Sequence, residues 1–193
     1  MQSRSLARDL RTVPNLITLG RLFIVAAAAW TFLTGFIWLA ILLGIAAGVS
    51  DHLDGILARR LNQVTDLGEI LDQFSDLIME AVFLLLLITH ERGPGPYVLA
   101  IYLVREFWVV TIRRYMAAKG LNIKSSFLGK VKTNVIGWSL IFYCIYVANL
   151  LPDLEAVCFW IGAGGLGTGL ALSWYTGLDY TRQFVRGYNS LPG

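Results

Sequence analysis

The sequence is poor in charged side chains and in cysteine, and each shortage argues against a class of protein. Only 15 % of the 193 residues are charged, whereas 56 % are hydrophobic. Soluble domains are usually about 45 to 50 % apolar, so this excess predicts a chain embedded in lipid. The two cysteines, Cys144 and Cys158, stand in apolar surroundings, which argues against a disulfide framework or a metal–thiolate site.

Hydropathy and chain breakers divide the sequence into long apolar segments. Glycine or proline stands in the connections, at Gly35, residues 92–96, Gly120 and residues 151–153. The pattern predicts an all-α integral membrane protein with six transmembrane helices, at residues 15–33, 36–61, 66–90, 97–118, 127–151 and 155–185. No polar linker separates these segments, so we expect a single membrane domain over residues 1–193.

Basic residues mark the orientation of the predicted bundle. In residues 1–14, arginines lie opposite leucines at helical spacing, which predicts an amphipathic helix in the membrane interface or, alternatively, an ordinary basic tail. Most of the other basic residues fall at the same set of helix ends, and Arg92 falls in a loop at the opposite ends. The positive-inside rule therefore predicts cytoplasmic termini, including the tail 186–193, in a bacterial-type inner or plasma membrane. Basic residues spread over loop ends also argue against a nucleic-acid partner.

Acidic residues concentrate between positions 51 and 80, where four aspartates form two pairs. Asp51 and Asp54 are three residues apart, and Asp72 and Asp76 are four apart, so each pair shares one helical face. Counted from a turn near Gln63, both pairs lie roughly 13 to 20 Å along their helices. The two pairs are thus predicted to converge on one cytoplasmic site.

Four carboxylates inside a membrane are costly and repel one another, which predicts bound cations. Oxygen ligands without thiolate or imidazole favour Mg²⁺ or Mn²⁺ over Zn²⁺, and four acids suit two metal ions better than one. Gly55, Ala58 and Gly68 leave room beside these faces for a flat ligand, although close helix packing is the alternative for each. Arg59 offers a phosphate partner at the rim. These residues predict a metal-dependent phosphate site.

One stretch resembles the signature of the CDP-alcohol phosphatidyltransferase family at every fixed position, Asp51-x2-Asp54-Gly55-x2-Ala58-Arg59-x8-Gly68-x3-Asp72-x3-Asp76. The resemblance implies a homodimeric enzyme that moves the phosphatidyl group of CDP-diacylglycerol to a small alcohol. It also implies that two Mg²⁺ or Mn²⁺ ions are held by Asp51, Asp54, Asp72 and Asp76. Asp76 would in addition take the proton of the acceptor hydroxyl. The CDP pocket would be lined by Asp54, Gly55, Ala58, Arg59 and Gly68.

Three further stretches resemble the phosphatidylglycerophosphate synthases within this family. They are Pro14-Asn15-x2-Thr18-x2-Arg21, Arg105-Glu106 followed by Arg113, and Gly129-Lys130-Val131-Lys132-Thr133. The resemblance implies glycerol 3-phosphate as the acceptor, a dianion that needs cations beyond the metals. The candidate partners of its phosphate are Arg21, Arg105, Arg113, Lys130 and Lys132. For Arg105 the alternative is that Glu106 neutralises its charge within the bundle. For most of the others the alternative is that they only set the orientation of the helices in the membrane.

The identity of the acceptor is the part of this prediction that has alternatives. Residues 72–77 read Asp-Gln-Phe-Ser-Asp-Leu, whereas those synthases commonly have Asp-Pro-Leu-Ala-Asp-Lys. Inositol phosphate, phosphatidylglycerol and serine are therefore alternative acceptors. A cation-coupled transporter is a more distant alternative, because intramembrane aspartates also mark ion pathways.

Overall fold

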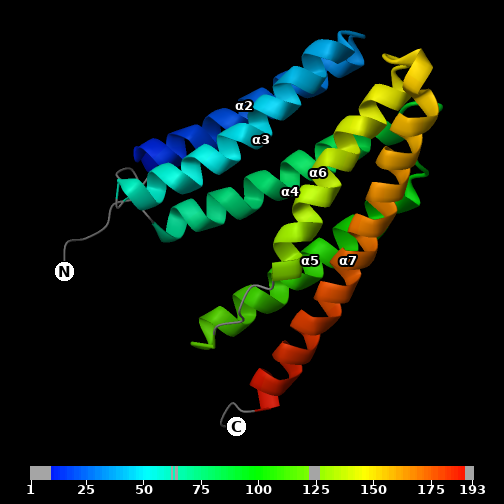
Figure 1. Ribbon diagram of the computed structural model, residues 1–193. Helices are drawn as coiled ribbons and strands as arrows, with labels where there is room; N and C mark the ends of the chain where they lie inside the picture. Colours follow the sequence, from blue (N-terminus) through cyan, green and yellow to red (C-terminus); the bar gives the residue numbers. More distant parts are fainter. Residues whose placement is uncertain (1–9, 62, 64, 122–126, 190–193) are drawn as a thin grey trace. The chain divides into compact units, whose positions relative to one another are not determined.

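The computed structural model describes residues 10–61, 63, 65–121 and 127–189, apart from the side chains of His52, Asp66 and Lys130. Within these ranges the chain forms six α-helices, one short 3-10 helix and no strand (Figure 1). The predicted all-α class is confirmed. The interfacial helix predicted for residues 1–14 falls largely on residues 1–9, outside the described ranges.

The helices follow the predicted segments closely. They are α2 (Val13–Leu33), α3 (Ile37–Arg60), α4 (Asp66–Ile88), α5 (Tyr97–Ala118), α6 (Phe127–Val147) and α7 (Glu155–Asn189), with η1 (Pro152–Leu154) before α7. Gly35 and Gly120, which follow α2 and α5, adopt φ angles of 86° and 74° that only glycine reaches without steric cost. Helix α6 ends four residues earlier than predicted, because Asn149 adopts a φ of 51° and the chain turns there.

Three segments of the described chain are long and apolar enough to cross a membrane. They are α2, α3 and the segment Pro152–Asn189. Their outer side chains suit a lipid environment, since Phe23, Trp30 and Trp160 are 78 %, 70 % and 71 % exposed. The described part of the chain is therefore all-helical and contains three candidate membrane spans. Six spans and a single domain stay predictions.

The first compact unit, residues 1–86, contains α2, α3 and most of α4. Helices α2 and α3 pack side by side, and side chains join α4 to both of them (Figure 1). Near the start of α4, Asn15 of α2 donates a hydrogen bond from Nδ2 to Thr65 Oγ1 at 3.3 Å. Farther along, a Cβ at Gly44 would lie 2.8 Å from the Phe83 ring, so this glycine allows α3 and α4 to approach. These contacts bring the start of α2 beside the start of α4.

The second compact unit, residues 87–193, contains α5, α6 and α7. Helix α7 packs against both α5 and α6. One buried apolar cluster of this unit consists of Val109, Ile112, Met116 and Tyr180, with Leu121 and Phe184 packed against it.

Three glycines of α7 allow its close approach to α6. A Cβ at Gly162 would lie 2.8 Å from the backbone nitrogen of Tyr143, and a Cβ at Gly169 would lie 2.6 Å from Ile136 Cγ1. Gly165 faces Ser139 in the same way. Small residues at such positions let helix backbones approach closely, which is how membrane helices gain packing contacts.

Two alanine substitutions on α7 test this packing. Gly162→Ala is expected to lower the free energy of unfolding by about 1 to 3 kcal/mol, because the added methyl group meets backbone that has no freedom to move aside. Gly164→Ala is the matched control, since a Cβ there would meet nothing within 4 Å. Its stability should stay unchanged or rise by up to about 1 kcal/mol through helix propensity. Thermal unfolding in detergent measures both, and equal effects would contradict the packing.

Candidate metal centre

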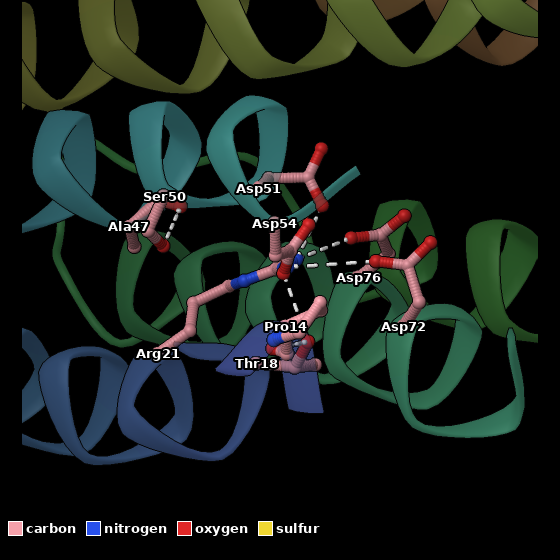
Figure 2. A network of polar contacts seen from close by, with 9 residues as sticks. All are labelled: Pro14, Thr18, Arg21, Ala47, Ser50, Asp51, Asp54, Asp72 and Asp76. Carbon is pink, nitrogen blue, oxygen red and sulfur yellow. Dashed lines mark hydrogen bonds and ion pairs between the residues drawn. The ribbon is translucent and has the colours of Figure 1, made fainter. Parts of the chain in front are cut away.

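Four aspartates from two helices of the first unit converge on one point (Figure 2). Asp51 and Asp54 come from the second half of α3, and Asp72 and Asp76 come from the first half of α4. Carboxylate oxygens of Asp51, Asp72 and Asp76 lie within 4.8 Å of one another. The two pairs meet at one level, as the count of residues from the connecting turn predicts.

A guanidinium group from α2 lies at the centre of these carboxylates (Figure 2). Nη1 of Arg21 pairs with Asp51 and, at 2.9 Å, with Asp76. Nη2 pairs with Asp54 and, at 3.4 Å, with Asp72. The Arg21 side chain is fully buried, which an arginine tolerates only when opposite charge surrounds it.

The four carboxylates differ in their access to solvent. Asp54 is 5 % exposed, whereas Asp51, Asp72 and Asp76 are 29 %, 50 % and 38 % exposed. Thr18 of α2 donates a hydrogen bond from Oγ1 to Asp54 Oδ2 at 2.8 Å. Asp54 therefore lies on the closed side of the cluster, and the other three aspartates form its open side.

Thr18 is a site residue that the sequence reasoning did not select. It appears in the stretch Pro14-Asn15-x2-Thr18-x2-Arg21, and its spacing of three from Asn15 and from Arg21 puts all three residues on one face of α2. All three side chains are buried. The polar face that these three residues form on an otherwise apolar helix is the signal that could have identified Thr18.

The donor set fits a hard divalent cation. Asp51, Asp72 and Asp76 can each offer one oxygen to a common ion, and the group contains no sulfur or imidazole ligand. Partly exposed carboxylates of this kind suit Mg²⁺ or Mn²⁺. Asp54 falls outside this group of three, and its contacts in the described structure include Arg21 and Thr18. The joint role of all four aspartates as metal ligands stays a prediction.

The residues predicted to line a CDP pocket lie on α3 and α4. A Cβ at Gly55 would meet nothing within 4 Å, so the space beside it is open, and Ala58 is half-buried. Arg59 is exposed and donates from Nε to the Gly55 carbonyl oxygen at 3.1 Å. At Gly68 a Cβ would lie 2.6 Å from Asn15 Oδ1, so this glycine permits contact between α4 and α2. The roles of these residues toward CDP stay predictions.

The basic residues predicted for the acceptor phosphate belong to the second unit, apart from Arg21. Arg105 is buried and donates to the Ser173 carbonyl oxygen and to Thr176 Oγ1, both at 2.7 Å. It also pairs with Glu106 Oε1 at 2.6 Å, and the same oxygen pairs with Lys132. Neutralisation of Arg105 by Glu106, the alternative seen in the sequence, is thus present in the structure.

Two basic candidates remain, Arg113 and Lys130. The guanidinium carbon of Arg113 lies 5.9 Å from the centre of the Tyr180 ring, a cation–π distance. The side chain of Lys130 lies outside the described part of the chain. Binding of an acceptor phosphate by any of these residues stays a prediction.

Comparisons with known proteins match most of the chain. A family model described as CDP-alcohol phosphatidyltransferase matches residues 11–170. A Pectobacterium atrosepticum protein named CDP-diacylglycerol–glycerol-3-phosphate 3-phosphatidyltransferase is 34 % identical over 178 aligned residues, which cover 87 % of this chain and 92 % of that protein. Proteins of the same name from Cereibacter sphaeroides and Bacillus subtilis are 34 % and 31 % identical, over 89 % and 63 % of this chain and 95 % and 70 % of their own lengths.

Proposed function

The chain belongs to the CDP-alcohol phosphatidyltransferase family, and from this premise we propose that it transfers the phosphatidyl group of CDP-diacylglycerol to glycerol 3-phosphate. The products are phosphatidylglycerophosphate and CMP. The observation that carries the proposal is the convergence of four aspartates from α3 and α4, with oxygens of three of them within 4.8 Å of one another. The names of the relatives support glycerol 3-phosphate as the acceptor.

In this proposal the aspartate cluster holds two Mg²⁺ or Mn²⁺ ions. Their ligands would be Asp51, Asp54, Asp72 and Asp76. The chemistry that such ions would supply is neutralisation of the charge on the pyrophosphate and on the departing CMP. The open side of the cluster, where Asp72 and Asp76 are 50 % and 38 % exposed, gives a phosphate group access to this charge.

Asp76 is the proposed general base. A carboxylate oxygen of Asp76 takes the proton of the acceptor hydroxyl, while Arg21 holds Oδ1 of the same carboxylate at 2.9 Å. The hydroxyl oxygen then forms a bond to the phosphorus that carries the diacylglycerol. The bond between that phosphorus and the CMP oxygen breaks, so one P–O bond replaces another. The CDP group is oriented by residues that line its pocket, namely Asp54, Gly55, Ala58, Arg59 and Gly68.

The phosphate of the acceptor is a dianion, and the second unit carries buried positive charge that suits it. Arg105 and Lys132 share a single carboxylate, that of Glu106, which leaves one positive charge in excess in this cluster. We propose that the cluster, together with Arg113 and Lys130, binds the acceptor phosphate. Arg21 is not needed for this role, because four carboxylates already surround it.

We further propose that the protein spans the membrane six times as a homodimer, with one membrane domain per chain and with cytoplasmic termini and site. Each of the six helices has at least 21 residues, and about 20 are needed to cross the hydrocarbon core. The distribution of arginine and lysine supports the orientation.

A turnover assay tests the proposed function. Purified protein in detergent micelles is expected to release CMP from CDP-diacylglycerol only when a divalent metal and glycerol 3-phosphate are both present. Removal of the metal with EDTA should stop turnover, because the negative charge of the carboxylates and of the pyrophosphate would then not be neutralised. Excess Mg²⁺ should restore it. Turnover in EDTA, or none with any acceptor, would count against the proposal.

A further inference from the structure

Arg21 is linked to every aspartate of the cluster, although the proposed reaction gives it no chemical step. We propose that Arg21 is a resident counter-cation, a positioning residue that holds the four aspartates in their assembled arrangement before any metal ion binds. The expectation that metal ions later bind to this arrangement rests on the proposed function. The role of Arg21 as counter-charge to the aspartates rests on the ion pairs alone.

The geometry of the guanidinium group supports this role. Each terminal nitrogen bridges two helices, because Nη1 contacts Asp51 of α3 and Asp76 of α4, and Nη2 contacts Asp54 of α3 and Asp72 of α4. The guanidinium is planar and presents its donors in a fixed fork, so one side chain can set the spacing of both aspartate pairs. A lysine ammonium is a single point charge and cannot span all four carboxylates in the same way.

Burial distinguishes this role from ligand binding. The Arg21 side chain is 0 % exposed and lies beside Asp54, on the closed side of the cluster. Its Nε is buried and has no hydrogen-bond partner within the described structure, so the two terminal nitrogens make the contacts that orient the group. A ligand arriving from the open side would meet the carboxylates before it met Arg21.

The arrangement also leaves room for metal ions. Arg21 contacts one oxygen of each carboxylate, namely Oδ1 of Asp51, Asp72 and Asp76 and Oδ2 of Asp54. Figure 2 shows the second oxygen of Asp51, Asp72 and Asp76 pointing away from the guanidinium. Arg21 can therefore remain in place while the open side of the cluster binds cations.

The first test measures how far stability depends on metal. Arg21→Gln removes the charge at similar length, so the metal-free carboxylates repel one another without compensation. We expect its Tm in EDTA to fall by several degrees, and most of this loss to disappear in MnCl₂. The Mn²⁺-induced rise in Tm should be roughly twice that of the wild type or more, with Arg21→Lys in between. An equal loss of Tm with and without Mn²⁺ would show that Arg21 serves only packing, and would overturn the proposal.

The second test needs neither metal nor turnover. In EDTA, adding Asp51→Asn to Arg21→Gln should raise the Tm, because it removes one of the repelling charges. Asp51→Asn alone should not raise the Tm of the wild type, where Arg21 already compensates Asp51. If Asp51→Asn lowers the Tm by the same amount in the wild type and in Arg21→Gln, the proposal is overturned. If Arg21→Gln can be purified only in Mn²⁺, the metal is chelated after purification. Arg21→Gln is then expected to unfold, and the variant that also carries Asp51→Asn is expected to unfold more slowly.

The outcome for Arg21 can be separated from the outcome for the proposed function. A wild-type protein that releases no CMP would contradict the function, while the double-variant comparison in EDTA would still decide the role of Arg21. Conversely, suppose that the wild type is active while the loss of stability in Arg21→Gln does not depend on metal. That result would leave the proposed function standing and overturn the role of Arg21 as counter-cation.

Discussion

Asp76→Asn is expected to lower the kcat of phosphatidyl transfer by about 10²- to 10⁴-fold, because an amide cannot take the proton of the acceptor hydroxyl. Asparagine has the size of aspartate, and its carbonyl oxygen can keep the contact that Arg21 Nη1 makes at 2.9 Å. Binding of CDP-diacylglycerol should therefore be largely preserved. The kcat follows from CMP release, and the Kd for CDP-diacylglycerol follows from calorimetry in Mn²⁺.

Asp153→Asn is a suitable control for this variant. Asp153 is an exposed residue of η1 in the second unit, and the proposed reaction does not use it. Turnover at the wild-type rate in Asp76→Asn would contradict the role of Asp76 as the base. A parallel loss of turnover and of CDP-diacylglycerol binding would instead assign Asp76 to holding metal alone.

Glu106→Gln is expected to lower the free energy of unfolding by about 3 to 5 kcal/mol, because it leaves two buried cations without their shared counter-charge. The carboxylate of Glu106 pairs with both Arg105 and Lys132, whose side chains are only 4 % and 9 % exposed. It also accepts a hydrogen bond from Ser173 Oγ at 3.2 Å. Denaturant unfolding in detergent micelles measures the loss.

Glu155→Gln is the matched control for the buried pair. Glu155 pairs with Arg92, but these two side chains are 39 % and 36 % exposed, so water already solvates their charges. Loss of an exposed pair of this kind costs about 1 kcal/mol or less. If the two substitutions lower the free energy of unfolding equally, burial does not explain the contribution of Glu106 to stability.

The helices could be predicted from the sequence because their limits are set locally. Each is a largely apolar run of about membrane length, and glycine or proline stands at four of the five breaks. The predicted range 97–118 coincides with α5. The end of α6 was predicted too late, because the reversal at Asn149 depends on a positive φ angle that asparagine adopts only in some contexts.

The site could be predicted in part. The spacing of the aspartates within α3 and α4 is a property of single helices, so their convergence was visible in the sequence. The ion pairs of Arg21 with these aspartates were not, although Arg21 was a candidate partner of the acceptor phosphate, because they depend on how α2 packs against α3, which no spacing within one helix reveals. Gly68 illustrates the same limit: the sequence indicated room for a ligand or a packing contact, and the structure has Asn15 beside it.

The central claim is the transfer of a phosphatidyl group to glycerol 3-phosphate. Its most direct test offers the purified protein CDP-diacylglycerol and Mg²⁺ together with equal amounts of glycerol 3-phosphate, inositol phosphate, phosphatidylglycerol and serine, and identifies the lipid products by mass spectrometry. Phosphatidylglycerophosphate, formed in step with CMP, is the predicted product. A different phospholipid as the main product, or CMP without any new phospholipid, would contradict the claim.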